Sequence, residues 1–136
     1  MTRKGRILWL RIAFWTGAVL DAAAFLQMMF PRFMAEVMKV GFEVTPAYEM
    51  AMQFGAALML AWTILLIWAA RSPVERKAIV PLTLIIIVLN FITFLQSAHR
   101  GLVPLETLLP QLVIIALVFF LYAFAWLCAI NIESAD

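Results

Sequence analysis

Four long apolar runs dominate the sequence and constrain its fold more than any other feature. One of them, Ile12–Phe30, contains a single charged residue, Asp21. The other three contain no charged residue: Met50–Ala70, Ala78–Ala98 and Thr107–Ile132. Each run reaches the roughly 17–25 residues that an α-helix needs to cross the hydrocarbon core of a bilayer. The sequence therefore predicts an all-α integral membrane protein, a four-transmembrane-helix bundle that forms a single domain over residues 1–136.

Cap residues and prolines predict where these helices begin and end. The expected spans are residues 8–30, 46–70, 73–98 and 105–131. Thr45 followed by Pro46 supplies an N-cap hydroxyl and a first-turn proline for the second helix. Residues 72–75, Ser-Pro-Val-Glu, have the pattern of a capping box, which predicts a third helix from residue 73. Pro81 is expected to kink or restart that helix near Lys77, and Pro110 fits only the first turn of the fourth helix.

The connection between the first two runs, residues 31–44, is predicted to form a short amphipathic helix. Phe33 and Val37 share one side at helical spacing, while Arg32 and Glu36 lie toward the other side. Such a helix lies on the membrane surface or folds over the outer face of the bundle. A loop without regular structure is the alternative interpretation.

Basic residues are distributed unevenly along the chain. Seven of the ten lie before the first run or between the second and third runs: Arg3, Lys4, Arg6, Arg11, Arg71, Arg76 and Lys77. The other connections hold only Arg32, Lys39 and Arg100. The positive-inside rule then places both termini in the cytoplasm. Because the charges account for orientation, they do not indicate a nucleic-acid interface.

Asp21 is the most informative polar residue, since a carboxyl group inside an apolar run is costly and commonly functional. With both termini in the cytoplasm, polar side chains concentrate in the outer half of every helix. This pattern predicts a pocket that opens outward. The candidate ligand-binding residues are Asp21, Glu49, Gln53, Asn90, Thr93, Gln111 and Tyr122. Gln111 and Tyr122 are eleven residues apart, which places them on one face of the fourth helix.

Structural interpretations of the same residues stay open. Asp21 forming a hydrogen bond with Asn90 or Gln53 would fix helix register without binding a ligand. Glu49 fits a first-turn acid that the helix dipole stabilises. The hydroxyl of Thr93, like those of other serines and threonines here, fits a bond to a carbonyl of its own helix.

Signatures of common enzymes are missing from the sequence. GxSxG, HExxH, P-loop and GxGxxG patterns are all absent, and His99 is the single histidine. One histidine and one cysteine, Cys128, fall short of a structural zinc site. We therefore assign no catalytic residue, metal or cofactor, and an enzyme is the less favoured class.

Three hypotheses about function follow. The leading one is that the protein binds an apolar small molecule or lipid in an outward-opening intramembrane pocket around Asp21. The second is a proton-coupled small-molecule transporter that uses Asp21 as its titrating group and works as a homodimer. The third is a structural subunit whose apolar faces contact another membrane protein, for example the face with Leu82, Ile85, Val88 and Leu89. The lipid bilayer is a partner in all three.

The stretch Tyr48–Lys77, YEMAMQFGAALMLAWTILLIWAARSPVERK, resembles the second helix and inner turn of small prokaryotic four-helix membrane proteins, a family that implies no activity. That resemblance implies the prokaryotic inner (plasma) membrane. The architecture is also similar to EXPERA-like domains, the group of sterol isomerases and sigma-2-type receptors. That likeness implies acids near the outer ends of the first two helices, which Asp21 and Glu49 match, and an isomerase histidine, which nothing here matches. The small multidrug resistance family shares the acid in helix 1 but has a glycine-rich third helix, which this chain lacks.

Overall fold

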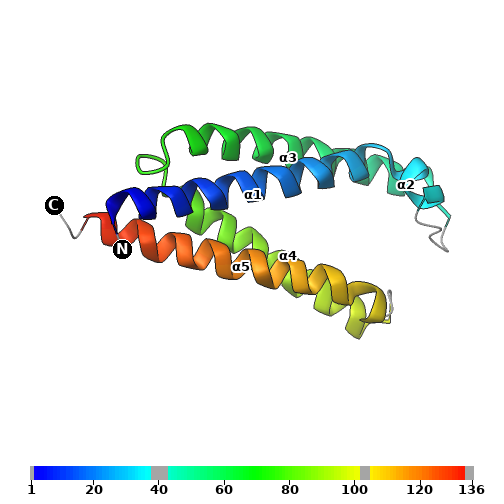
Figure 1. The fold of residues 1–136 in the computed structure, drawn as a ribbon. Helices are drawn as coiled ribbons and strands as arrows, with labels where there is room; N and C mark the ends of the chain where they lie inside the picture. Colours follow the sequence, from blue (N-terminus) through cyan, green and yellow to red (C-terminus); the bar gives the residue numbers. More distant parts are fainter. Residues whose placement is uncertain (1, 38–42, 102–104, 134–136) are drawn as a thin grey trace. The chain divides into compact units, whose positions relative to one another are not determined.

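A computed structural model describes residues 2–37, 43–101 and 105–133, and within them the side chains of 107 and 131–133 are excepted. These residues form five helices and no strand (Figure 1). The helices are α1 (Arg3–Met29), α2 (Pro31–Val37), α3 (Pro46–Arg71), α4 (Ile79–His99) and α5 (Leu105–Glu133). All but α2 are long and apolar enough to cross a membrane. The all-α fold class, with a short helix in the first connection, is confirmed, and the chain is a multi-pass membrane protein.

The chain divides into two compact units. The first unit contains Met1–Phe14 and Ala69–Asp136, and the second contains Trp15–Trp68. The first half of α1 therefore belongs to one unit and its second half to the other. The single domain expected from the sequence stays a prediction.

In the first unit, α4 and α5 form an antiparallel pair (Figure 1). Gly101, with φ of 67°, follows the last turn of α4 and lets the chain reverse, because glycine adopts a left-handed conformation without steric cost. The start of α1 packs against the end of α5, where the rings of Trp9 and Phe124 meet edge to face at 5.1 Å. Fully buried side chains gather at this end of the unit: Leu10, Ala13, Phe14, Val80, Tyr122, Ala125 and Ala129.

The third membrane helix begins at Ile79, so the capping box predicted from residue 73 is wrong. Residues 73–78 form a turn, and the Val80 N–H in the first turn of α4 donates back to the Lys77 carbonyl at 3.0 Å. Pro81 has no N–H for the Lys77 carbonyl, and its ring would clash there in a continuous helix. The regular helix therefore starts at Ile79 and holds Pro81 in its first turn. The predicted kink or restart near Lys77 does not occur, because no helix precedes Ile79 in this segment.

Two other helix ends differ from the prediction. α1 begins at Arg3 rather than residue 8, because the Thr2 hydroxyl accepts a hydrogen bond from the Gly5 N–H at 3.3 Å and caps the helix. Pro110 lies inside α5, beyond the first turn where it was expected. It leaves the Glu106 carbonyl without its usual N–H donor. Because Glu106 is exposed, water or lipid headgroups can reach that carbonyl.

In the second unit, α2 occupies only residues 31–37 of the predicted amphipathic segment. Residues 38–42 lie outside the described residues, and 43–45 have no regular structure. Pro31 is buried, whereas Phe33 and Val37 are each 62% exposed. The Thr45 hydroxyl accepts a hydrogen bond from the Tyr48 N–H at 3.3 Å, which confirms the predicted cap of α3.

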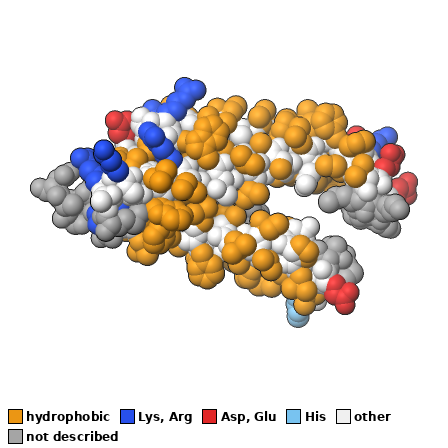
Figure 2. Space-filling view, in the orientation of Figure 1, with side chains coloured by type: hydrophobic (Ala, Val, Ile, Leu, Met, Phe, Trp, Pro, Cys, Tyr) orange, Lys and Arg blue, Asp and Glu red, His pale blue; other side chains and the backbone are white. Residues whose placement is uncertain are grey.

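Apolar side chains cover much of the surface seen in Figure 2, as expected for helices surrounded by lipid. Within the second unit, Gly55 of α3 lies against the Met28 side chain of α1. A Cβ atom added there would collide with the terminal methyl group of Met28 on α1. Small residues allow such contacts between membrane helices, where association depends on packing rather than on escape from water.

Candidate functional site

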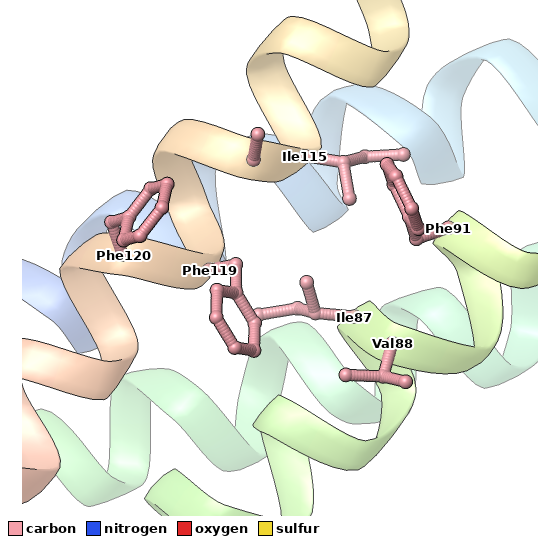
Figure 3. Close-up of a pocket in the computed structure, with 7 residues that line it drawn as sticks. Ile87, Val88, Phe91, Ile115, Phe119 and Phe120 are labelled. Atoms are coloured by element: carbon pink, nitrogen blue, oxygen red, sulfur yellow. The ribbon is translucent and has the colours of Figure 1, made fainter.

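An apolar groove lies between α4 and α5 in the first unit (Figure 3). It has a volume of about 290 Å³ and seven lining residues: Ile87, Val88, Phe91, Ile115, Ala116, Phe119 and Phe120. Val88 and Phe120 are exposed as well as lining, so the groove opens sideways to the surroundings of the helices. The described lining offers no polar side chain to a ligand.

Helical spacing explains why these side chains converge. On α4 they lie at positions i, i+1 and i+4, and on α5 at i, i+1, i+4 and i+5, so each set occupies one side of its helix. Figure 3 shows Ile115 and Phe91 reaching toward each other across the groove, with Phe119 beside Ile87. Ala116 is the smallest lining residue, and its short side chain leaves space that a larger one would fill.

The size and chemistry of the groove define what fits it. An engineered apolar cavity of about 150 Å³ in another protein stays dry and takes up benzene. A groove of about 290 Å³ therefore has room for a short acyl segment or a ring-sized apolar compound. A polar group placed inside it would lose hydrogen bonds without compensation. The groove thus accepts only the apolar part of a ligand.

Four of the predicted site residues belong to the first unit, and none of them lines the groove. Asn90, Thr93 and Gln111 are exposed, whereas Tyr122 is fully buried. The Thr93 hydroxyl donates to the Leu89 carbonyl at 2.9 Å. The Ser97 and Thr83 hydroxyls likewise bond to carbonyls of α4, so the structural interpretation of these hydroxyls is confirmed.

Gln111 and Tyr122 nevertheless flank the groove along α5. Ile115 follows Gln111 by four residues, and Tyr122 follows Phe119 by three, so all lie toward one side of the helix. The face that these two polar residues marked in the sequence is therefore the face that carries part of the groove. The apolar residues between them were missed, because α4 and α5 are hydrophobic on every side and periodicity cannot single out one face.

The second unit holds the remaining three predicted site residues, Asp21, Glu49 and Gln53. Asp21 is half-buried on α1, and Gln53 is exposed on α3. Within the described part of this unit, the Asp21 carboxyl accepts no hydrogen bond and forms no ion pair, so the bond to Gln53 considered above does not form. Asp21 is therefore a carboxyl group without a partner among the described residues of its unit, inside a membrane-length helix.

Glu49 has a different role, since it lies in the first turn of α3, as interpreted from the sequence, and forms an ion pair. The Arg32 Nε donates to Glu49 Oε2 at 2.9 Å, and Arg32 Nη2 lies 2.8 Å from the same oxygen. Arg32 was not among the candidate residues. The pair could have been predicted from the sequence, because Arg32 and Glu49 are opposite charges at the two ends of the same connection.

Among the described residues, His, Cys, Asp and Glu side chains do not gather in threes as metal ligands would. The chemistry that the described residues display is therefore that of an apolar groove in one unit and an isolated carboxyl group in the other. No family model, curated protein or solved structure matches this chain.

Proposed function

We propose that this protein binds a lipid or another apolar small molecule within the membrane, in the groove between α4 and α5. The observation that carries this proposal is an all-apolar groove of about 290 Å³ on two membrane-length helices. The ligand class is the one predicted from the sequence, and the proposal assigns it to a different place from the pocket predicted around Asp21.

Binding inside a bilayer cannot draw on the hydrophobic effect, since the ligand leaves one apolar medium for another. Affinity must come from the fit of the ligand and from dispersion contacts, which are individually weak and collectively large. Aromatic walls serve this purpose because their rings are large and rigid. Phe119 and Phe120, whose rings meet edge to face at 5.8 Å, supply such a wall on α5.

A photoreactive palmitic acid analogue tests the proposal on the purified full chain in detergent. We expect crosslinks at residues 87–91 and 115–120, mapped by mass spectrometry. Ala116→Phe fills the groove and is expected to reduce labelling by about tenfold, equivalent to about 1.4 kcal/mol. Ala57→Phe is the matched control, because Ala57 is exposed on α3. Equal labelling of wild type and Ala116→Phe, with both folded, would rule the groove out as the site.

We also propose that both termini lie in the cytoplasm and that the membrane is the prokaryotic inner membrane. The asymmetry of basic residues, seven against three, supports this orientation. Single cysteines introduced by Thr2→Cys or Arg100→Cys, in a Cys128→Ala background, provide the test with a membrane-impermeant maleimide. Intact cells should label the cysteine at 100, and the cysteine at 2 should react only after permeabilisation. The reverse pattern would invert the topology.

Proton-coupled transport is the second candidate. The half-buried carboxyl of Asp21, which has no partner among the described residues of its unit, favours it. Ionisable groups inside membrane helices commonly mark proton or ion pathways. Proteoliposomes with a pH gradient and a set of cationic dyes distinguish this function from binding alone. Flux that Asp21→Asn abolishes would support transport. Binding of palmitate without any pH-driven flux would leave the binding proposal as the function.

A further inference from the structure

We infer that the ligand of the groove is an anionic phospholipid, whose headgroup lies on the basic end of the first unit and whose acyl chain lies between α4 and α5. This inference rests on the proposed function, because it names the ligand class for the same groove. The lipid lies in the leaflet at the basic end, and its headgroup is negatively charged.

The basic end of the first unit contains the start of α1, the end of α3, the turn before α4 and the end of α5. Figure 2 shows Lys and Arg side chains gathered there. The seven basic residues are Arg3, Lys4, Arg6, Arg11, Arg71, Arg76 and Lys77. Among the side chains that the structure describes, one acid, Glu75, accompanies them in the turn before α4. The excess of positive charge attracts anionic lipids at the membrane surface.

The distance between the basic end and the groove matches the depth of one leaflet. α4 begins at Ile79, eight residues before Ile87, and α5 ends at Glu133, thirteen residues after Phe120. At 1.5 Å per residue, the near edge of the groove lies roughly 12 Å from the start of α4 and roughly 20 Å from the end of α5. Half of a hydrocarbon core of about 30 Å is about 15 Å, which lies between these two lengths. A phospholipid with its headgroup at the basic end therefore reaches the groove with the distal part of an acyl chain.

Two separate features would recognise such a lipid. The described lining of the groove has no polar side chain, so the groove binds the acyl chain and does not distinguish between headgroups. Discrimination between headgroups must then come from the basic end. Arg76 and Lys77 are half-buried in the turn that leads directly into α4. Their positions are therefore at the start of a helix that lines the groove. Arginine matches phosphate geometry with two parallel N–H donors.

The test compares phosphatidylglycerol with phosphatidylcholine of identical acyl chains, bound to the full chain in detergent and counted by native mass spectrometry. We expect phosphatidylglycerol to bind about tenfold more tightly, with the difference shrinking as salt is added. Arg76→Gln with Lys77→Gln should remove the preference and weaken phosphatidylcholine binding less than phosphatidylglycerol binding, because both lipids carry a phosphate but only phosphatidylglycerol has a net negative charge. Arg3→Gln with Lys4→Gln makes the same charge change at the start of α1 and should lower the preference less than the change at Arg76 and Lys77.

The outcomes separate this inference from the proposed function. Equal affinity of the two lipids for the wild type, with Ala116→Phe weakening both, would overturn the headgroup inference and leave the groove proposal standing. Equal losses from the two double variants would show diffuse attraction instead of a site, which also overturns the inference. Ala116→Phe leaving both lipids unaffected would overturn both proposals. If Arg76→Gln with Lys77→Gln does not fold, Lys77→Gln alone is compared with Lys4→Gln.

Discussion

The Arg32 guanidinium on α2 pairs with the Glu49 carboxylate in the first turn of α3, with 2.8 Å between Nη2 and Oε2. The two residues are seventeen positions apart, so the pair joins the two ends of the first connection. Pro31, the first residue of α2, is buried, so the start of this short helix is packed. A helix of seven residues is too short to be stable by itself, and these contacts hold α2 in place.

Breaking this pair should loosen α2 with little effect on global stability. The Arg32 side chain is 64% exposed, so Arg32→Gln or Glu49→Gln should cost less than about 1 kcal/mol. Hydrogen exchange of the amides in residues 31–37 should become faster in either variant. Arg32→Glu combined with Glu49→Arg should restore slow exchange. If the reversed pair exchanges as fast as the single variants, the ion pair does not order α2.

Gly55 is expected to tolerate alanine but not leucine. An alanine Cβ meets only the end of the flexible Met28 side chain, which can rotate away. A leucine requires α1 and α3 to move apart, at about 1–3 kcal/mol. Thermal unfolding in detergent measures the difference, and Ala57→Leu, at an exposed position of α3, is the control. A Gly55→Leu protein as stable as Ala57→Leu would mean that α1 and α3 are not in close contact there.

Asp21→Leu should make the protein more stable. The half-buried carboxyl loses hydration and gains no hydrogen bond within the described part of its unit, so its removal should add roughly 1–3 kcal/mol. Asp21→Asn, which keeps a polar group, should change stability less. The comparison uses unfolding midpoints of the three proteins. A destabilised Asp21→Leu variant would show that the carboxyl has a stabilising partner.

Trp9 and Phe124 should be energetically coupled, because their rings meet edge to face at 5.1 Å with an interplanar angle of 84°. A double-mutant cycle with Trp9→Leu and Phe124→Leu should give a coupling of about 0.5–1.5 kcal/mol. Trp9→Leu with Phe120→Leu, at a residue 69% exposed on α5, should be additive. A coupling near zero for Trp9 and Phe124 would contradict the packing of the start of α1 against α5.

The helical architecture was predictable because the bilayer leaves few alternatives. A run of about twenty apolar residues in lipid must satisfy its backbone hydrogen bonds internally, so run length alone indicates a helix. α3 follows the prediction within one residue, from Pro46 to Arg71, since a threonine cap and a proline mark its start. At Ile79 the prediction was wrong because two local patterns competed, and the steric demand of Pro81 outweighed the capping box.

The same distinction applies to the candidate site, since part of it was predictable from the sequence and part was not. The sequence by itself determined the four spanning helices, the lone carboxyl of Asp21 inside the first and the polar positions Gln111 and Tyr122 along α5. Only the tertiary structure decided that Ile115 and Phe91 meet around a groove, and that Glu49 pairs with Arg32. The physical reason is that helices apolar on every side carry no stripe to mark their contact face, so helix packing selects it.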